Sequence, residues 1–151
     1  TGERTFEAAA YLRRRGADTV TVKRLFSDSF DTYKTKYRIV SSADLLDGCA
    51  VAYTEQELPN LKIASAQAAD ELLTIEGVMA SFVIYPSDGV MNVSARSMGD
   101  MNVQLVMEAM GGGGHLTMAG AQMKDATVEQ VRSQLIEILR AGIGRGTIQK
   151  K

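Results

Sequence analysis

The sequence has few of the residues that build metal centres, disulfides and nucleophilic sites. It contains one cysteine, one histidine and no tryptophan among 151 residues. A single thiol excludes an internal disulfide and a cysteine-rich zinc site. Because His115 is the only histidine, a metal site built on several histidines is excluded as well. We therefore expect neither a metal site nor a catalytic residue within this chain.

The motifs of several common catalytic and phosphate-binding sites are also missing. The sequence contains no Gly-x-Ser-x-Gly elbow. Cys49 begins the apolar run Cys49–Tyr53, where we interpret it as a small buried side chain in a strand rather than as a nucleophile. No Gly-Lys-Ser or Gly-Lys-Thr follows the glycine run at 111–114, which excludes a P-loop.

The sequence has no excess of basic residues. It carries 17 basic and 18 acidic side chains, a formal net charge of −1, and a sequence pI of about 5.8. Proteins that hold long nucleic acids by counterion release usually have a basic face and a high pI, so this balance argues against a general DNA or RNA coat. A ligand with one or two phosphates stays compatible, because a local pocket can be positive on a neutral protein.

Long hydrophobic runs are absent, although 45% of the residues are hydrophobic. No apolar stretch approaches the roughly 20 residues that span a bilayer. The first residues show no signal-peptide pattern, so we expect a cytoplasmic domain. Because the chain starts at Thr1 and runs straight into a helical pattern, we also expect it to be part of a longer protein.

Hydrophobic periodicity predicts an α/β fold with a mixed sheet of about four or five strands, helices packed on it, and linker helices ahead of it. We expect Thr5, Asp100 and Thr127 to cap helices, with Gln130 completing a capping box. The expected helices cover residues 5–16, 21–46 with a break near 27–30, 60–75, 100–110 and a stretch from 127. The expected strands cover residues 49–53, 78–85, 90–97 and 121–123.

The run Gly111-Gly112-Gly113-Gly114-His115 is the most informative stretch of the sequence. Four consecutive glycines lose much conformational entropy on folding, which is a cost. Such a run is useful where the backbone must approach a ligand closely. Concave sets of backbone N–H groups bind anions, and a histidine that can be cationic suits a phosphate oxygen. These residues indicate a phosphate-binding loop. A flexible hinge with an incidental histidine is the alternative.

A polar strand face supplies a second indication. Within the strand expected at 90–97, Asn92, Ser94 and Arg96 alternate with apolar residues and therefore share one face. The planar donor fork of Arg96 suits a phosphate or a carboxylate. The same pattern is also typical of the solvent side of an edge strand.

Four segments of the sequence together resemble the DHH-associated C-terminal domain of DHH-family phosphoesterases. In chain order they are Arg96-Ser97, Asn102-Val103, the glycine–histidine run and Ala119-Gly120. Residues 4–18 resemble the end of a DHH domain and the start of its linker. The similarity covers nearly the whole chain. The subgroup that it resembles most is the bacterial cyclic-di-AMP phosphodiesterases that are membrane-anchored through an N-terminal region.

This resemblance implies a division of labour between two domains. The DHH domain would hold two manganese ions and activate water against cyclic-di-AMP, and its ligands would lie ahead of Thr1, so the chain alone would be inactive. Residues 1–47 would be the end of the DHH domain and linker helices, and residues 48–151 the substrate-binding domain. The implied substrate-binding residues are Arg96, Ser97, Gly111, Gly112, Gly113, Gly114 and His115.

The implied partners are a cyclic or linear dinucleotide and the DHH domain of the same chain. Two alternatives stay open for the function. The domain could belong to a phosphoesterase that acts on short oligoribonucleotides or adenosine bisphosphate, or it could be a non-catalytic RNA-binding module, which the acidic pI disfavours. Short RNA and a second copy of the chain are the further partners that we consider.

Overall fold

The computed structural model describes residues 2–145 and contains helices and strands in mixed order. The helices are α1 (Glu3–Arg14), α2 (Thr19–Leu25), α3 (Phe30–Ser41), α4 (Leu61–Leu72), α5 (Val103–Ala109) and α6 (Val128–Arg140). The strands are β1 (Asp44–Leu46), β2 (Cys49–Tyr53), β3 (Ala80–Ser87), β4 (Val90–Ser97), β5 (Gly113–Gly114) and β6 (Met118–Met123).

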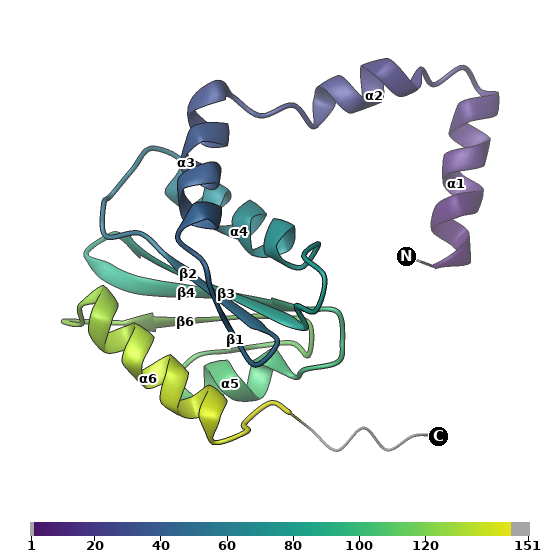
Figure 1. Cartoon of the computed structure of the whole chain (residues 1–151). Helices are drawn as coiled ribbons and strands as arrows, with labels where there is room; N and C mark the ends of the chain where they lie inside the picture. The colour runs from purple at the N-terminus through teal and green to yellow at the C-terminus, as the bar shows by residue number, and fades with distance from the viewer. Residues whose placement is uncertain (1, 146–151) are drawn as a thin grey trace, which may run out of the picture.

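The strands form one mixed sheet with the order β1-β2-β3-β4-β6-β5 (Figure 1). Strands β2 and β3 run parallel and are joined through α4, while every other neighbouring pair is antiparallel. The expected α/β class with a mixed sheet and preceding helices is confirmed. The sheet has six strands in the described residues, and the additional ones are β1 and β5.

Strand β1 lies in a segment that the pattern predicts as helix, and that prediction is wrong. Residues 44–46 pair with β2 across a tight turn at Asp47 and Gly48, which have φ angles of 47° and 78°. A turn with two positive φ angles matches the twist of a hairpin, and Asp-Gly is a favoured sequence for it. The pairing across this turn overrides the helix preference of the two leucines.

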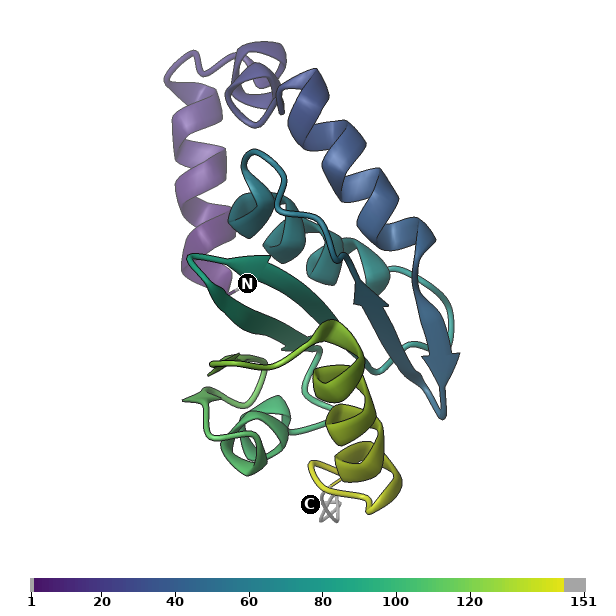
Figure 2. The same ribbon diagram turned by 90° about the vertical axis from the view of Figure 1, so that its left-hand side faces the viewer.

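Helices cover both faces of the sheet and create two hydrophobic cores (Figures 1 and 2). Helices α5 and α6 pack on one face around the fully buried Phe82 of β3. Helix α4 packs on the other face and is itself covered by α3 through the fully buried Ile39. The buried residues of α4 include three alanines, whose small side chains let the helix lie close to the sheet. These alanines are Ala64, Ala68 and Ala69.

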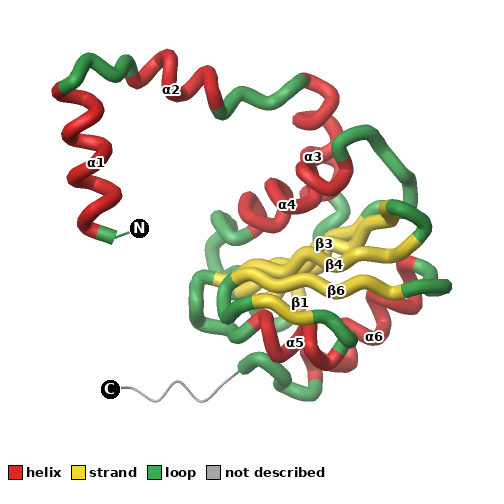
Figure 3. Tube along the Cα trace, turned by 180° about the vertical axis from the view of Figure 1, so that it is seen from behind, coloured by secondary structure: helices red, strands yellow, loops and turns green. Residues whose placement is uncertain are grey.

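Strand β6 is covered on one face only. Ala119 and Ala121 are buried in the core with α5 and α6, whereas Met118 and Gln122 on the opposite face are exposed. The strand is longer than the predicted 121–123 because residues 118–123 pair continuously with β4. Figure 3 shows the sheet from behind, with β6 beside β4. The uncovered face of β6 is therefore continuous with the polar face of β4.

Two of the predicted helix caps are wrong. Thr5 does not cap α1, because the helix begins two residues earlier after Gly2, whose carbonyl accepts from the Thr5 N–H. Asp100 does not cap α5, because the last non-helical residue is Asn102, whose Oδ1 accepts from the Gln104 N–H at 3.1 Å. The predicted break near 27–30 is confirmed, since α2 ends at Leu25 and α3 begins at Phe30.

The predicted capping box at Thr127 is confirmed. The Thr127 hydroxyl accepts from the Gln130 N–H at 3.2 Å, and the Gln130 side chain accepts from the Thr127 N–H at 2.9 Å. These bonds satisfy two of the backbone donors that a helix start leaves free.

Thr127→Ala is expected to lower the free energy of unfolding by about 1 kcal/mol, because it removes the hydroxyl that caps α6. Urea unfolding followed by circular dichroism measures the change. Ser133→Ala on the exposed face of the same helix is the control and should change stability by at most about 0.5 kcal/mol. Equal unfolding midpoints for Thr127→Ala and the unaltered chain would show that the box contributes nothing.

Candidate functional site

The glycine run continues the end of α5 into strand β5. Gly111 has a φ angle of 79° and its N–H bonds to the Glu108 carbonyl, while the Gly112 N–H bonds to the Met107 carbonyl. This is a Schellman end, in which glycine supplies the left-handed residue. The N–H groups of Gly111 and Gly112 therefore hold the helix end.

Two of the glycines are required because β5 approaches β6 very closely. A Cβ atom on Gly112 would lie 2.2 Å from the Gly120 carbonyl oxygen, and one on Gly114 would lie 2.4 Å from Ala119 Cα. Both distances are far below a van der Waals contact. Much of the glycine run thus serves backbone-to-backbone contact inside the protein. Gly111 and Gly112 close the end of α5, and Gly113 and Gly114 pair with β6 as strand β5.

Gly113 differs from its neighbours. A Cβ atom there would meet nothing within 4 Å, and its φ angle lies outside the left-handed region. Gly113 pairs with Gly120, which faces away from the buried Ala119 and Ala121. The position therefore opens onto the uncovered face of the sheet, where a side chain would project into open space rather than into the protein.

His115 follows β5 on a well-anchored turn. Its N–H bonds to the Met118 carbonyl at 2.7 Å, and the Met118 N–H returns a bond of 3.3 Å to the His115 carbonyl. The two intervening carbonyls, of Leu116 and Thr117, accept from Val103 and Ser97 at 3.0 Å each. The turn is thus tied both to the start of α5 and to the end of β4, which leaves the His115 side chain exposed on a fixed backbone.

The register brings His115 and Arg96 into one row. Arg96 is opposite Met118 in the β4–β6 pair, and Met118 is bonded to His115 on the other side. Directly opposed residues of antiparallel strands project from the same face. The backbones of Arg96 and His115 are therefore two strand spacings apart, about 10 Å, and both side chains leave the same face of the sheet. The Arg96 side chain is 13% exposed beside α4, whereas His115 is exposed.

Arg96 is held in place by contacts with α4 and with its own strand. Its Nε lies 3.2 Å from Asp70 Oδ1 of α4, and its Nη1 donates to the Ala95 carbonyl at 3.0 Å. Nε is at ion-pair distance but makes no hydrogen bond with Asp70. Arginine has five N–H donors, so these contacts use only part of the fork.

The Ser97 side chain is buried and makes its hydrogen bonds within the protein. Its hydroxyl lies 2.6 Å from the Met101 carbonyl oxygen and 3.3 Å from the Leu116 carbonyl oxygen. It also accepts from the Gly99 N–H at 3.3 Å. As the next residue along the strand, Ser97 faces the opposite way from Arg96. Its hydroxyl ties the loop before α5 to the turn that carries His115.

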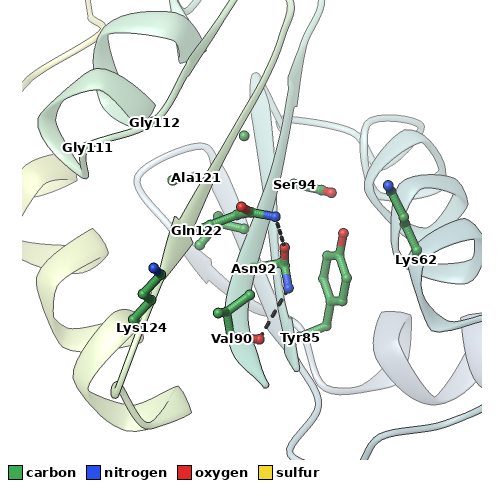
Figure 4. Close-up of a pocket in the computed structure, with 12 residues that line it drawn as sticks. Lys62, Tyr85, Val90, Asn92, Ser94, Gly111, Gly112, Ala121, Gln122 and Lys124 are labelled. Atoms are coloured by element: carbon green, nitrogen blue, oxygen red, sulfur yellow. Dashed lines mark hydrogen bonds between the residues drawn. The ribbon is translucent and has the colours of Figure 1, made fainter. Parts of the chain in front are cut away.

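A groove of about 560 Å³ lies beside the Arg96–His115 row, between α4 and the uncovered strands (Figure 4). Of the predicted residues it includes Gly111 and Gly112 but not Arg96 or His115. Its polar side chains come from Lys62, Tyr85, Asn92, Ser94, Gln122 and Lys124.

The sequence pattern places Asn92 and Ser94 on the face of Arg96, and the structure confirms this. The sequence pattern does not single out Lys62, Gln122 or Lys124 as site residues. Gln122 and Lys124 alternate with apolar residues at the end of β6, which is a usable signal once residues 118–123 are treated as one strand.

Cys49 has the buried position that the sequence predicts. Its side chain is fully buried and its thiol lies 3.6 Å from Met101 Sδ. Burial raises the pKa of the Cys49 thiol, with Arg145 acting in the opposite direction. A thiol that stays protonated is a poor nucleophile.

Residues 2–145 contain no group of three or more His, Cys, Asp or Glu side chains placed to hold a metal ion. Within the same residues, no helix has the length and apolar character to cross a bilayer.

The chain is similar to much longer bacterial enzymes. It is 47% identical over 141 residues to the cyclic-di-AMP phosphodiesterase GdpP of Geobacillus thermodenitrificans, a match that covers 92% of this chain and 21% of that protein. It is 44% identical over 143 residues to the cyclic-di-AMP phosphodiesterase PdeA of Listeria monocytogenes, covering 93% and 22%. The chain therefore spans about a fifth of the length of these relatives.

Solved structures share the fold at low sequence identity. An exopolyphosphatase-related protein from Bacteroides fragilis superposes with a TM-score of 0.76 at 19% identity, covering 93% of this chain and 45% of that one. RecJ from Thermus thermophilus, solved in complex with Mn²⁺, has a TM-score of 0.54 at 16% identity, covering 73% and 16%.

The family model of the DHHA1 domain matches residues 49–141, from the first residue of β2 to the residue after α6. This range includes the whole glycine–histidine run, the Arg96 strand and every residue that lines the groove. The chain therefore belongs to the DHHA1 domain family.

Proposed function

We propose that this chain is the substrate-binding part of a phosphodiesterase that hydrolyses cyclic-di-AMP. The observation that carries the proposal is the row formed by Arg96 and His115 on one face of the sheet. Two donors that suit phosphate oxygens project from the same face, on backbones held by hydrogen bonds. The relatives at 44–47% identity are cyclic-di-AMP phosphodiesterases, which supports this choice of substrate.

Phosphate binding on this face depends on side chains more than on a nest of backbone amides. The N–H groups of Gly111, Gly112 and His115 already bond within the protein. In the ladder of β5 and β6, Gly114 occupies a non-hydrogen-bonded position, so its N–H points out of the edge of the sheet. We assign Arg96 and His115 to the phosphate, with Gly114 as the backbone donor and Ser97 as the residue that positions the turn.

Gly113 gives the ligand access to the sheet. Because this position has no side chain, nothing projects from Gly113 between the Arg96–His115 row and the groove. A dinucleotide can then lie along the strands, with a phosphate at the row and the remainder in the groove.

The chemical step belongs to another part of the intact protein. Residues 2–145 present no metal-binding cluster, and we assign two manganese ions to a DHH domain of the same chain, which is also the domain partner of this one. Residues 1–47 would then be the end of that domain and its linker, and residues 48–151 the DHHA1 domain. Binding one phosphate remotely helps to place the scissile bond at the metals. We place this domain in the cytoplasm as part of a membrane-anchored protein.

The chain alone is expected to show no phosphodiesterase activity with cyclic-di-AMP and Mn²⁺. The physical reason is that no described residues are arranged to hold the metal that would activate water. Chromatography of the nucleotides after incubation measures product, with a reaction lacking protein as the control. Turnover clearly above that control would contradict the division of labour.

His115→Ala is expected to weaken binding of pApA by roughly 1.5–3 kcal/mol, the range for a hydrogen bond to a charged group. Calorimetric titration of the chain with pApA and cyclic-di-AMP measures the loss. Thr117→Ala is the matched control, because Thr117 is exposed on the same turn. Unchanged affinity in His115→Ala would remove His115 from the site, and binding of structured RNA in place of dinucleotides would favour an RNA-binding module.

Substitutions at two neighbouring glycines distinguish a role in folding stability from a role in ligand binding. Gly112→Ala is expected to lower the free energy of unfolding by about 1–3 kcal/mol, because its methyl group would meet the Gly120 carbonyl. Gly113→Ala should leave stability unchanged but weaken pApA binding by roughly 1–3 kcal/mol, because its methyl group would enter the ligand's space.

Urea unfolding and calorimetric titration of the same two proteins test this contrast. Full pApA affinity in Gly113→Ala would show that the ligand does not cross the sheet at this point.

A further inference from the structure

The floor of the groove carries a pair of side-chain amides whose orientation is fixed by the backbone. Asn92 on β4 is buried, and its Nδ2 lies 3.2 Å from the Val90 carbonyl oxygen and 3.4 Å from that of Ser87. Because both neighbours are acceptors, the donating nitrogen of Asn92 must face them. Its Oδ1 therefore faces the other way, toward Gln122.

This arrangement also fixes the amide of Gln122 on β6. Gln122 Nε2 donates to Asn92 Oδ1 at 3.0 Å, so the Gln122 nitrogen must face β4. An amide has two N–H donors and an acceptor oxygen. The bond to Asn92 uses one N–H group and leaves the second N–H and Oε1. Gln122 is exposed at the groove, so a fixed donor and a fixed acceptor sit side by side at its floor.

The surroundings of Gln122 favour an anionic ligand with a flat polar edge. Figure 4 shows the Gln122–Asn92 pair with Lys124 on one side and with Tyr85 and Lys62 on the other. Among the described residues that line the groove, two are lysines and none is a carboxylate. The floor beside Gln122 is built from Gly111, Gly112 and Gly120, which leaves room above the backbone.

We infer that this groove is a nucleobase subsite in which Gln122, oriented by Asn92, reads the edge of an adenine. The inference rests on the proposed function, which supplies a nucleotide ligand whose phosphate lies at Arg96 and His115. The rows of Asn92–Gln122 and of Arg96–His115 are separated along the strands by the row of Ser94, Gly120 and Gly113. These residues are small, so the sugar can pass over them between phosphate and base.

Adenine matches the two free groups of the Gln122 amide. It offers an N6 amino donor beside a ring-nitrogen acceptor, which a glutamine side chain meets with two hydrogen bonds. On its N7 edge guanine offers two acceptors, so the Oε1 atom of Gln122 would face another acceptor there. Uracil is a pyrimidine and has no N7 edge. On the N7 edge, the Gln122 amide therefore pairs with adenine and not with guanine or a pyrimidine.

The test compares three linear dinucleotides, pApA, pGpG and pUpU, by calorimetric titration of the 151-residue chain. Gln122→Met keeps the length of the side chain but removes both polar groups. It is expected to lower pApA affinity roughly 5- to 150-fold, the loss expected for a bidentate base contact. The affinity for pUpU should change little, so the preference for pApA shrinks. Gln134→Met on the exposed face of α6 is the control and should leave all three affinities unchanged.

The outcomes separate this inference from the function on which it rests. Unchanged pApA affinity in Gln122→Met, in a chain that binds pApA and loses it in His115→Ala, would overturn the base subsite and leave the phosphate row standing. An equal loss for pApA and pUpU would also overturn it, because the effect would not depend on the base. Absence of pApA binding to the unaltered chain would overturn both. Thermal unfolding of Gln122→Met, expected to match the unaltered chain, shows that the variant is folded.

Discussion

The contact between β5 and β6 governs the geometry of the whole candidate site. At Gly112 and Gly114 the two backbones approach so closely that no Cβ atom fits between them, and the Gly111 turn at the end of α5 delivers the chain into this position. Because β6 is paired with β4 on its other side, the same contact sets the register of His115 against Arg96. A side chain at either crowded glycine would therefore disturb a strand first, and through it the relative position of two residues that lie on different strands.

The sequence predicts the class of fold because most elements carry agreeing local signals. Helix α6 has an apolar stripe and a capping box, and β3 and β4 flank an Asp-Gly turn at residues 88–89. Strand β1 lacks such a signal, since Asp44, Leu45 and Leu46 suit a helix and become a strand only through pairing with β2. The caps expected at Thr5 and Asp100 fail for a related reason. Several residues near each helix start can cap it, and the path of the chain decides which one does.

The candidate site could be predicted only in part, because its geometry depends on register. The motif residues Arg96 and His115 stand out in the sequence, but only the pairing of β4, β6 and β5 places them in one row. The glycine run has two physical explanations in the sequence, contact with a ligand or contact with another strand. The structure assigns Gly112 and Gly114 to the second and leaves Gly113 open. Gln122 carries only the signal of its alternation with apolar residues, and its importance comes from the buried amide of Asn92 on a different strand.

The two outer strands of the sheet are β1 at one end and β5 at the other, with three and two residues. An outer strand exposes unpaired N–H and C=O groups, and a long, flat one can recruit strands from other molecules. Edges this short offer few such groups. The protein can thus expose a polar ligand-binding face beside one edge while giving little opportunity for chains to add to the sheet and aggregate.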